Sequence, residues 1–140
     1  AIAEDHVPST KAPDPFMHIF LDAGDNNVLA FFELPTQLEM GSDVNTPKWV
    51  QHIALKVKDV ETLKAYREHF EVNGSDVLII TDHSLFHSIY FFDLNGHRFE
   101  LAAPDPQEEA KLKRLDTVKW EMLEEWSKTK RAPKHVAWMH

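Results

Sequence analysis

The sequence contains no cysteine, so it can form neither disulfides nor zinc sites with thiolate ligands. This absence fits a reducing compartment, and we expect a cytoplasmic protein. No apolar run approaches the ~20 residues that span a bilayer, so we expect no membrane association. Acidic residues outnumber basic ones by 23 to 15, giving a net charge of -8. This balance argues against a nucleic-acid partner, which would require a basic stripe.

Histidine and acidic residues are plentiful. Nine histidines accompany the 23 acidic residues, so imidazole and carboxylate groups are the metal ligands that the chain offers. The 140 residues are 43% hydrophobic and 27% charged, which is ordinary for a globular protein and enough to bury one core.

The N-terminal third carries mostly strand and turn signals. Two runs rich in aromatic and branched residues predict strands, and the small, polar residues between them predict a hairpin. The expected elements are a short strand within 1–7, a proline-containing loop at 8–15, strands at 16–21 and 27–34, the turn 23–26, and loop formers over 35–47.

Residues 50–102 predict a β-α-β-β-β order. Residues 50–57 alternate, with Ile53, Leu55 and Val57 on one face and His52 on the other. Asp59 then predicts an N-cap. The remaining expected elements are a helix that stops at Asn73-Gly74, strands at 77–80, 87–93 and 97–102, and the turn 94–96.

A second helix is predicted from Asp105, with Pro106 in its first turn and Glu108 completing a capping box. Its apolar stripe predicts that it covers the domain or a dimer partner. The stripe comprises Leu112, Leu115, Met122, Leu123 and Trp126. An extended tail is expected after it.

A short internal repeat indicates a duplicated module. Residues 32–34 (Phe-Glu-Leu) recur 67 positions later as residues 99–101, each copy following an aromatic strand that ends in aspartate. Counting back by the same offset places the opening strand and helix of the first module before residue 1. We therefore divide the chain into a partial first module (1–34), a linker (35–49), a complete second module (50–103), and a C-terminal helix and tail (104–140).

Three acidic or imidazole side chains lie opposite apolar neighbours on their strands: Glu33, His52 and Glu100. Because burying such a group unpaired is costly, each is expected to face water, a cleft or a metal ion. Two carboxylates and one imidazole suit Fe(II), Mn(II), Ni(II), Co(II) or Zn(II).

The strand at 50–57 and the run 89–100 resemble the vicinal oxygen chelate superfamily, which contains glyoxalase I, bleomycin-resistance proteins and extradiol dioxygenases. The resemblance implies an α+β fold in which paired βαβββ modules form a cupped mixed sheet, plus the C-terminal helix, and a homodimer. It makes His52 and Glu100 the second module's metal ligands and Glu33 the first module's glutamate. The first module's histidine would precede residue 1.

The residues around His83 resemble the signature of ring-cleavage dioxygenases. Residues 81–83 (Thr-Asp-His), Tyr90 and Glu100 match it, and Leu94 stands where the family has proline. By this resemblance His83 and Tyr90 are acid/base or hydrogen-bonding groups, and Glu100 is a carboxylate ligand of Fe(II). The favoured function is extradiol-type oxidation of a small catechol-like substrate.

Two alternatives stay open. If Glu33 is a fourth ligand, the site resembles that of a glyoxalase-I-like isomerase or lyase, in which a glutamate moves a proton of a metal-bound enediolate. The third reading is a non-enzymatic, bleomycin-resistance-type binding protein, because a fold does not fix a function.

Overall fold

The computed structural model describes residues 2–24, 26–38, 41, 44–132, 134 and 138. The chain forms two compact units, Ala1–Asn45 and Thr46–His140, and their boundary falls inside the predicted linker. Position 25 of the predicted turn, four positions of the linker and most of the predicted tail lie outside the described residues. The fold is α+β, as predicted, with two sheets and two helices in the described part. No described helix is long and apolar enough to cross a membrane.

The first unit is an antiparallel sheet in the order β1-β2-β3, formed by β1 (Ile2–His6), β2 (Pro13–Asp22) and β3 (Val28–Glu33). The predicted hairpin between β2 and β3 is confirmed. The loop predicted over 8–15 is too long, because β2 begins at Pro13. β1 pairs with this early part of β2, matching Glu4 with Phe16 and His6 with Pro13, and so extends the strand beyond its aromatic run.

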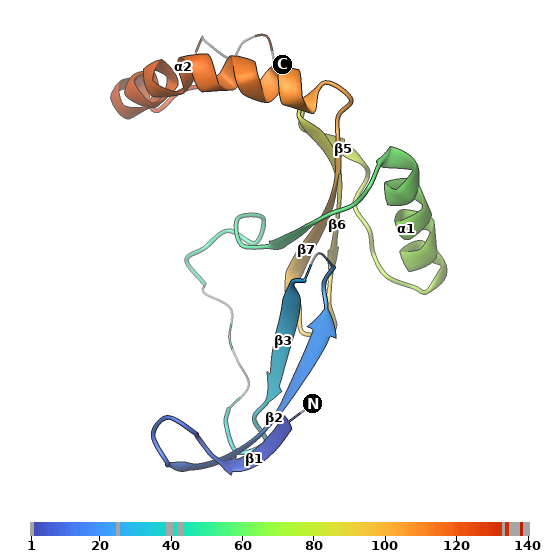
Figure 1. The fold of residues 1–140 in the computed structure, drawn as a ribbon, viewed down its shortest axis with the longest axis vertical. Helices are drawn as coiled ribbons and strands as arrows, with labels where there is room; N and C mark the ends of the chain where they lie inside the picture. Colours follow the sequence, from blue (N-terminus) through green and yellow to red (C-terminus); the bar gives the residue numbers. More distant parts are fainter. Residues whose placement is uncertain are drawn as a thin grey trace. The chain divides into compact units, whose positions relative to one another are not determined.

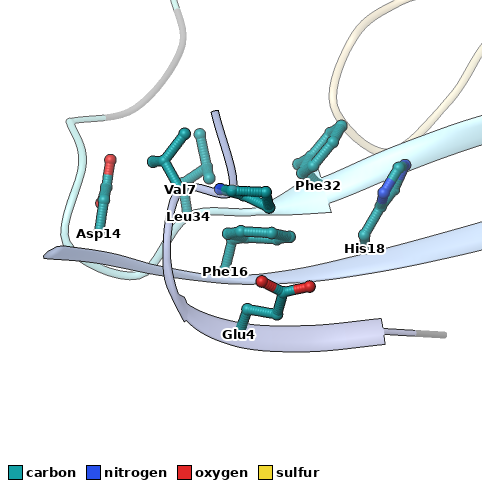
Figure 2. A pocket seen from close by; sticks show the side chains of 8 residues that line it. Glu4, Val7, Asp14, Phe16, His18, Phe32 and Leu34 are labelled. Carbon is teal, nitrogen blue, oxygen red and sulfur yellow. The ribbon is translucent and has the colours of Figure 1, made fainter. Parts of the chain in front are cut away.

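The two faces of this small sheet differ in chemistry. Phe16, His18 and Phe32 share one face, where the His18 and Phe32 rings are stacked with their centroids 3.8 Å apart. They line a pocket of about 410 Å³, shown in Figure 2. Met17 and Glu33 pair with each other on the opposite face. Glu33 therefore lies away from this aromatic pocket, as its alternation with Phe32 predicts.

The second unit contains the predicted β-α-β-β-β order (Figure 1). Its sheet has the order β4-β7-β6-β5, with β4 parallel to β7 and the other pairs antiparallel. The elements are β4 (Ile53–Lys56), α1 (Val60–Val72), β5 (Thr81–Asp82), β6 (Phe86–Phe92) and β7 (Arg98–Pro104).

Two strand predictions in this unit differ from the structure. β4 is shorter than the predicted 50–57, because the Val50 N–H donates to Pro47 O (2.9 Å) in a turn and pairing with β7 starts only at Ile53. The strand predicted at 77–80 is wrong. The Leu78 N–H donates to Tyr90 O (2.9 Å), but the ladder with β6 forms at β5 instead.

Helix α1 covers one face of the four-stranded sheet (Figure 1). Asp59 caps it as predicted, accepting from the Thr62 N–H at 2.8 Å, and the chain leaves it through Gly74 at φ +80°. Leu63 is fully buried and packs against the sheet. The sheet residues in this core are Ile89, Leu101 and Ala103. Along β6 and β7, each of these core residues is followed by a residue whose side chain lies on the opposite face of the sheet.

The long helix α2 (Glu108–Thr129) follows β7. The predicted capping box is wrong, because Asp105 accepts instead from the Gln107 N–H and from Lys111 Nζ, each at 2.8 Å, and the helix starts later. Lys111 accordingly lowers the pKa of Asp105. None of the residues of α2 is buried against the described chain, so the predicted covering of the domain is not observed there.

Candidate metal centre

His52 and Glu100 meet on the face of the sheet opposite α1. Glu100 of β7 pairs with Ala54 of β4, and His52, two positions before Ala54, therefore lies on the same face as Glu100. His52 Nε2 lies 2.8 Å from Glu100 Oε2, and His52 Nδ1 lies 3.1 Å from Val50 O. His52 directly precedes β4, whereas the sequence predicts it within the strand. The parallel pairing of β4 with β7 nevertheless brings the two predicted ligands together.

Glu100 is buried and bonded at both carboxylate oxygens. It is 4% exposed, and the fully buried Ser88 hydroxyl donates to its Oε1 while His52 contacts Oε2. The His52 side chain keeps 27% of its surface exposed. A buried carboxylate is costly unless hydrogen-bonded, and these two partners meet that requirement. They also fix the orientation of the carboxylate.

Tyr90 joins this pair to His83. It lies directly across from Glu100 in the β6–β7 ladder, and its hydroxyl is 2.9 Å from His83 Nε2. Burial, followed by the neighbouring Glu100 charge, raises the pKa of Tyr90. The hydroxyl therefore stays protonated at neutral pH and can donate a hydrogen bond. The His52 ring approaches the Tyr90 ring edge-on, with centroids 5.8 Å apart.

The five predicted site residues are divided between the units. His52, His83, Tyr90 and Glu100 form one connected group in the second unit, whereas Glu33 lies at the end of β3 in the first. Among the described residues, no group of three or more histidine or acidic side chains is arranged to hold a metal ion. The second unit by itself thus offers a pair of ligands.

The side-chain types of this pair suit a divalent cation. The 2.8 Å contact between His52 Nε2 and Glu100 Oε2 is a hydrogen-bond distance, and it shows that the two side chains are directed at each other. An imidazole and a carboxylate suit Fe(II), Mn(II), Ni(II), Co(II) or Zn(II) equally well in type. His52 and Glu100 are the residues that would hold the ion.

Two neighbours of this group have no role in the sequence-based prediction. Ser88 lies two positions before Tyr90 and Arg98 two positions before Glu100, so both share the polar face. The Arg98 guanidinium carbon lies 4.1 Å from the centroid of the Tyr90 ring. Period-two alternation places both residues on the polar face, but serine and arginine on a strand face carry no motif that singles them out.

Sequence comparison identifies no family, since no family model matches the chain and no curated protein matches it significantly. Structure comparison finds fosfomycin resistance proteins named FosX. The Listeria monocytogenes protein in complex with Mn(II) and sulfate is 26% identical, with a TM-score of 0.45 over 79% of this chain and 78% of that one. The Mesorhizobium loti protein is 23% identical, with a TM-score of 0.48 over 79% and 75%.

These TM-scores describe a partial likeness, and it carries no information about substrate. The matched FosX proteins are members of the vicinal oxygen chelate superfamily.

Proposed function

We propose that this protein is a divalent-metal-dependent enzyme that acts on a small molecule with oxygen atoms on two neighbouring carbon atoms. One observation carries the proposal: the 2.8 Å contact between His52 Nε2 and Glu100 Oε2, on the sheet face opposite the α1 core. Ser88 holds the second oxygen of the same buried carboxylate. We propose His52 and Glu100 as ligands of the ion in both candidate reactions, with Glu33 as a further ligand in the isomerase candidate.

The chemistry that we favour is oxidative ring cleavage of a catechol-like substrate, with Fe(II) as the metal. When bound, the metal would supply the site at which the substrate oxygens and O2 are brought together. The observation in favour is the 2.9 Å contact between the Tyr90 hydroxyl and His83 Nε2. In its neutral form His83 can accept a substrate proton, and Tyr90 can donate to a substrate oxygen. The balanced reaction consumes one O2 per ring opened and leaves both oxygen atoms in the product.

The second candidate is a glyoxalase-I-like isomerase or lyase, and the position of Glu33 favours it. Glu33 alternates with Phe32 on β3 as Glu100 alternates with Phe99 on β7, so the two modules present a carboxylate at equivalent places. In this candidate Glu33 takes a proton from the carbon next to the chelated oxygens and returns it to the neighbouring carbon. The reaction then needs no oxygen.

Oxygen uptake by the Fe(II)-loaded protein on a panel of catechols tests the favoured chemistry. We expect uptake in the wild type, near-complete loss in His52→Ala and Glu100→Gln, and a hundredfold or greater loss in His83→Gln if proton transfer is rate-limiting. His97→Ala is the matched control, because His97 is exposed and outside the site. Uptake that persists in Glu100→Gln would contradict the assignment.

The variant Glu33→Gln distinguishes the two candidate functions. Under anaerobic conditions, proton exchange into a hemithioacetal substrate by the wild type, together with its loss in Glu33→Gln, would support the isomerase and contradict ring cleavage. Full oxygen uptake in Glu33→Gln would support ring cleavage without a role for Glu33 as a proton acceptor.

A further inference from the structure

Arg98 is held beside the candidate metal centre. It is the first residue of β7, lies opposite Phe92 and points to the same face as Glu100. Its guanidinium carbon lies 4.1 Å from the centroid of the Tyr90 ring, within the range of a cation–π contact. The flat ring restricts the guanidinium to a position over Tyr90, so its N–H groups have a defined direction.

The half-buried Arg98 lacks an acceptor in the described part of the chain. Its Nε is buried and has no hydrogen-bond partner there. By contrast, Arg67 Nε donates to Glu71 at 2.8 Å. The nearest carboxylate along the strand, Glu100, already has one oxygen bonded to Ser88 and the other to His52. A buried guanidinium N–H without an acceptor is unfavourable, so an external acceptor would stabilise this arrangement.

We propose that Arg98 forms an oxyanion subsite next to the His52–Glu100 pair, with a carboxylate or phosphate-like group of the substrate as its ligand. The planar fork of arginine can bind two oxygens of such a group at once. Residues two apart on a strand are separated by roughly 6.6 Å. The substrate would therefore be a small organic acid whose anionic group lies several bonds away from its chelating oxygens. That the ligand is a substrate rests on the proposed function, whereas the anion site itself does not.

Anion binding to the metal-free protein tests the subsite separately from the metal. The protein is dialysed against a chelator and titrated with benzoate and, in a second series, with inorganic phosphate. The Arg98 side-chain Nε–Hε signal is followed by NMR and assigned by its loss in Arg98→Lys. We expect a saturable shift with at least one probe in the wild type. Isothermal titration calorimetry, which does not depend on the Arg98 signal, then compares the variants, and we expect at least a tenfold weaker affinity for that probe in Arg98→Gln.

Controls make the result specific. Arg67→Gln removes an equally charged arginine outside the site and should leave the affinity unchanged. Arg98→Lys retains the charge but loses the fork, and should weaken binding while keeping the near-ultraviolet circular dichroism of the wild type.

Saturation with benzoate identifies a carboxylate subsite, and saturation with phosphate identifies a phosphate-like one. Shifts that stay linear with both probes, or equal affinity in Arg98→Gln, would overturn the proposal. His52→Ala should lose metal binding and keep anion binding, so a failed metal assignment would leave this result intact.

Discussion

Replacing Ser88 with alanine tests whether the buried carboxylate of Glu100 is held by the protein itself. Ser88 is fully buried, and its hydroxyl donates to Glu100 Oε1. The substitution removes this donor and creates almost no cavity. One oxygen of a group that is only 4% exposed then lacks its protein donor. Hydrogen bonds to charged groups contribute about 1.5–3 kcal/mol, so we expect Ser88→Ala to lower the free energy of unfolding by that amount.

Urea unfolding of the metal-free protein measures this loss, since the effect does not depend on a bound ion. Ser127→Ala is the matched control. Its hydroxyl donates to Leu123 O at 2.7 Å on an exposed turn of α2, and its removal should change the free energy by less than about 0.5 kcal/mol. Because Ser88 also orients a proposed ligand, metal affinity should fall about ten- to a hundredfold. A Ser88→Ala protein as stable as the control, with unchanged metal affinity, would refute this role of Ser88.

Three further predictions concern the second unit. Tyr66→Phe leaves Tyr90 as the single tyrosine, and its absorbance at 295 nm should titrate with a midpoint above 10.0, because burial and the Glu100 charge raise its pKa. The stability that protonated Tyr90 contributes is complete below the pKa of Tyr90 in the unfolded state, and it is lost as the pH rises through the pKa of Tyr90 in the folded state. A titration midpoint at or below 10.0 would contradict the raised pKa. Leu63→Ala should lower the free energy of unfolding by about 2–5 kcal/mol in urea, since the Leu63 side chain of α1 is fully buried against the sheet. Gly74→Ala should cost about 1–2 kcal/mol because Gly74 has φ +80°, whereas Gly41→Ala, at a glycine without positive φ, should not. Equal stability of the two glycine variants would argue against the left-handed turn after α1.

The fold was largely predictable because its strongest local signals agree with its packing. Asp59 and Gly74 bound α1 where the sequence predicts, and the alternation along residues 53–57 identifies the face on which Leu55 and Val57 meet the core. The failures lie where a tertiary contact overrides a local pattern. Lys111 Nζ donates both to Asp105 and to the distant Ser84 carbonyl, and Asp105 does not cap α2.

The candidate site was predictable only in part. Alternation along single strands selects His52 and Glu100, and the parallel pairing of β4 with β7 brings them together. Ser88 and Arg98 could not be selected, because their importance comes from the antiparallel register of β6 and β7. That register places Ser88 and Tyr90 beside Glu100, and no pattern within one strand encodes it.

Metal binding by the full chain tests the central claim most directly. Chelator-treated protein is titrated with Mn(II), and the free ion is followed by electron paramagnetic resonance, in the wild type and in His52→Ala, Glu100→Gln and the control His97→Ala. We predict saturable binding of one ion in the wild type and the control, and at least a tenfold lower affinity in the other two variants. Equal Mn(II) binding by all four proteins, or no binding by the wild type, would contradict the assignment of His52 and Glu100 as ligands.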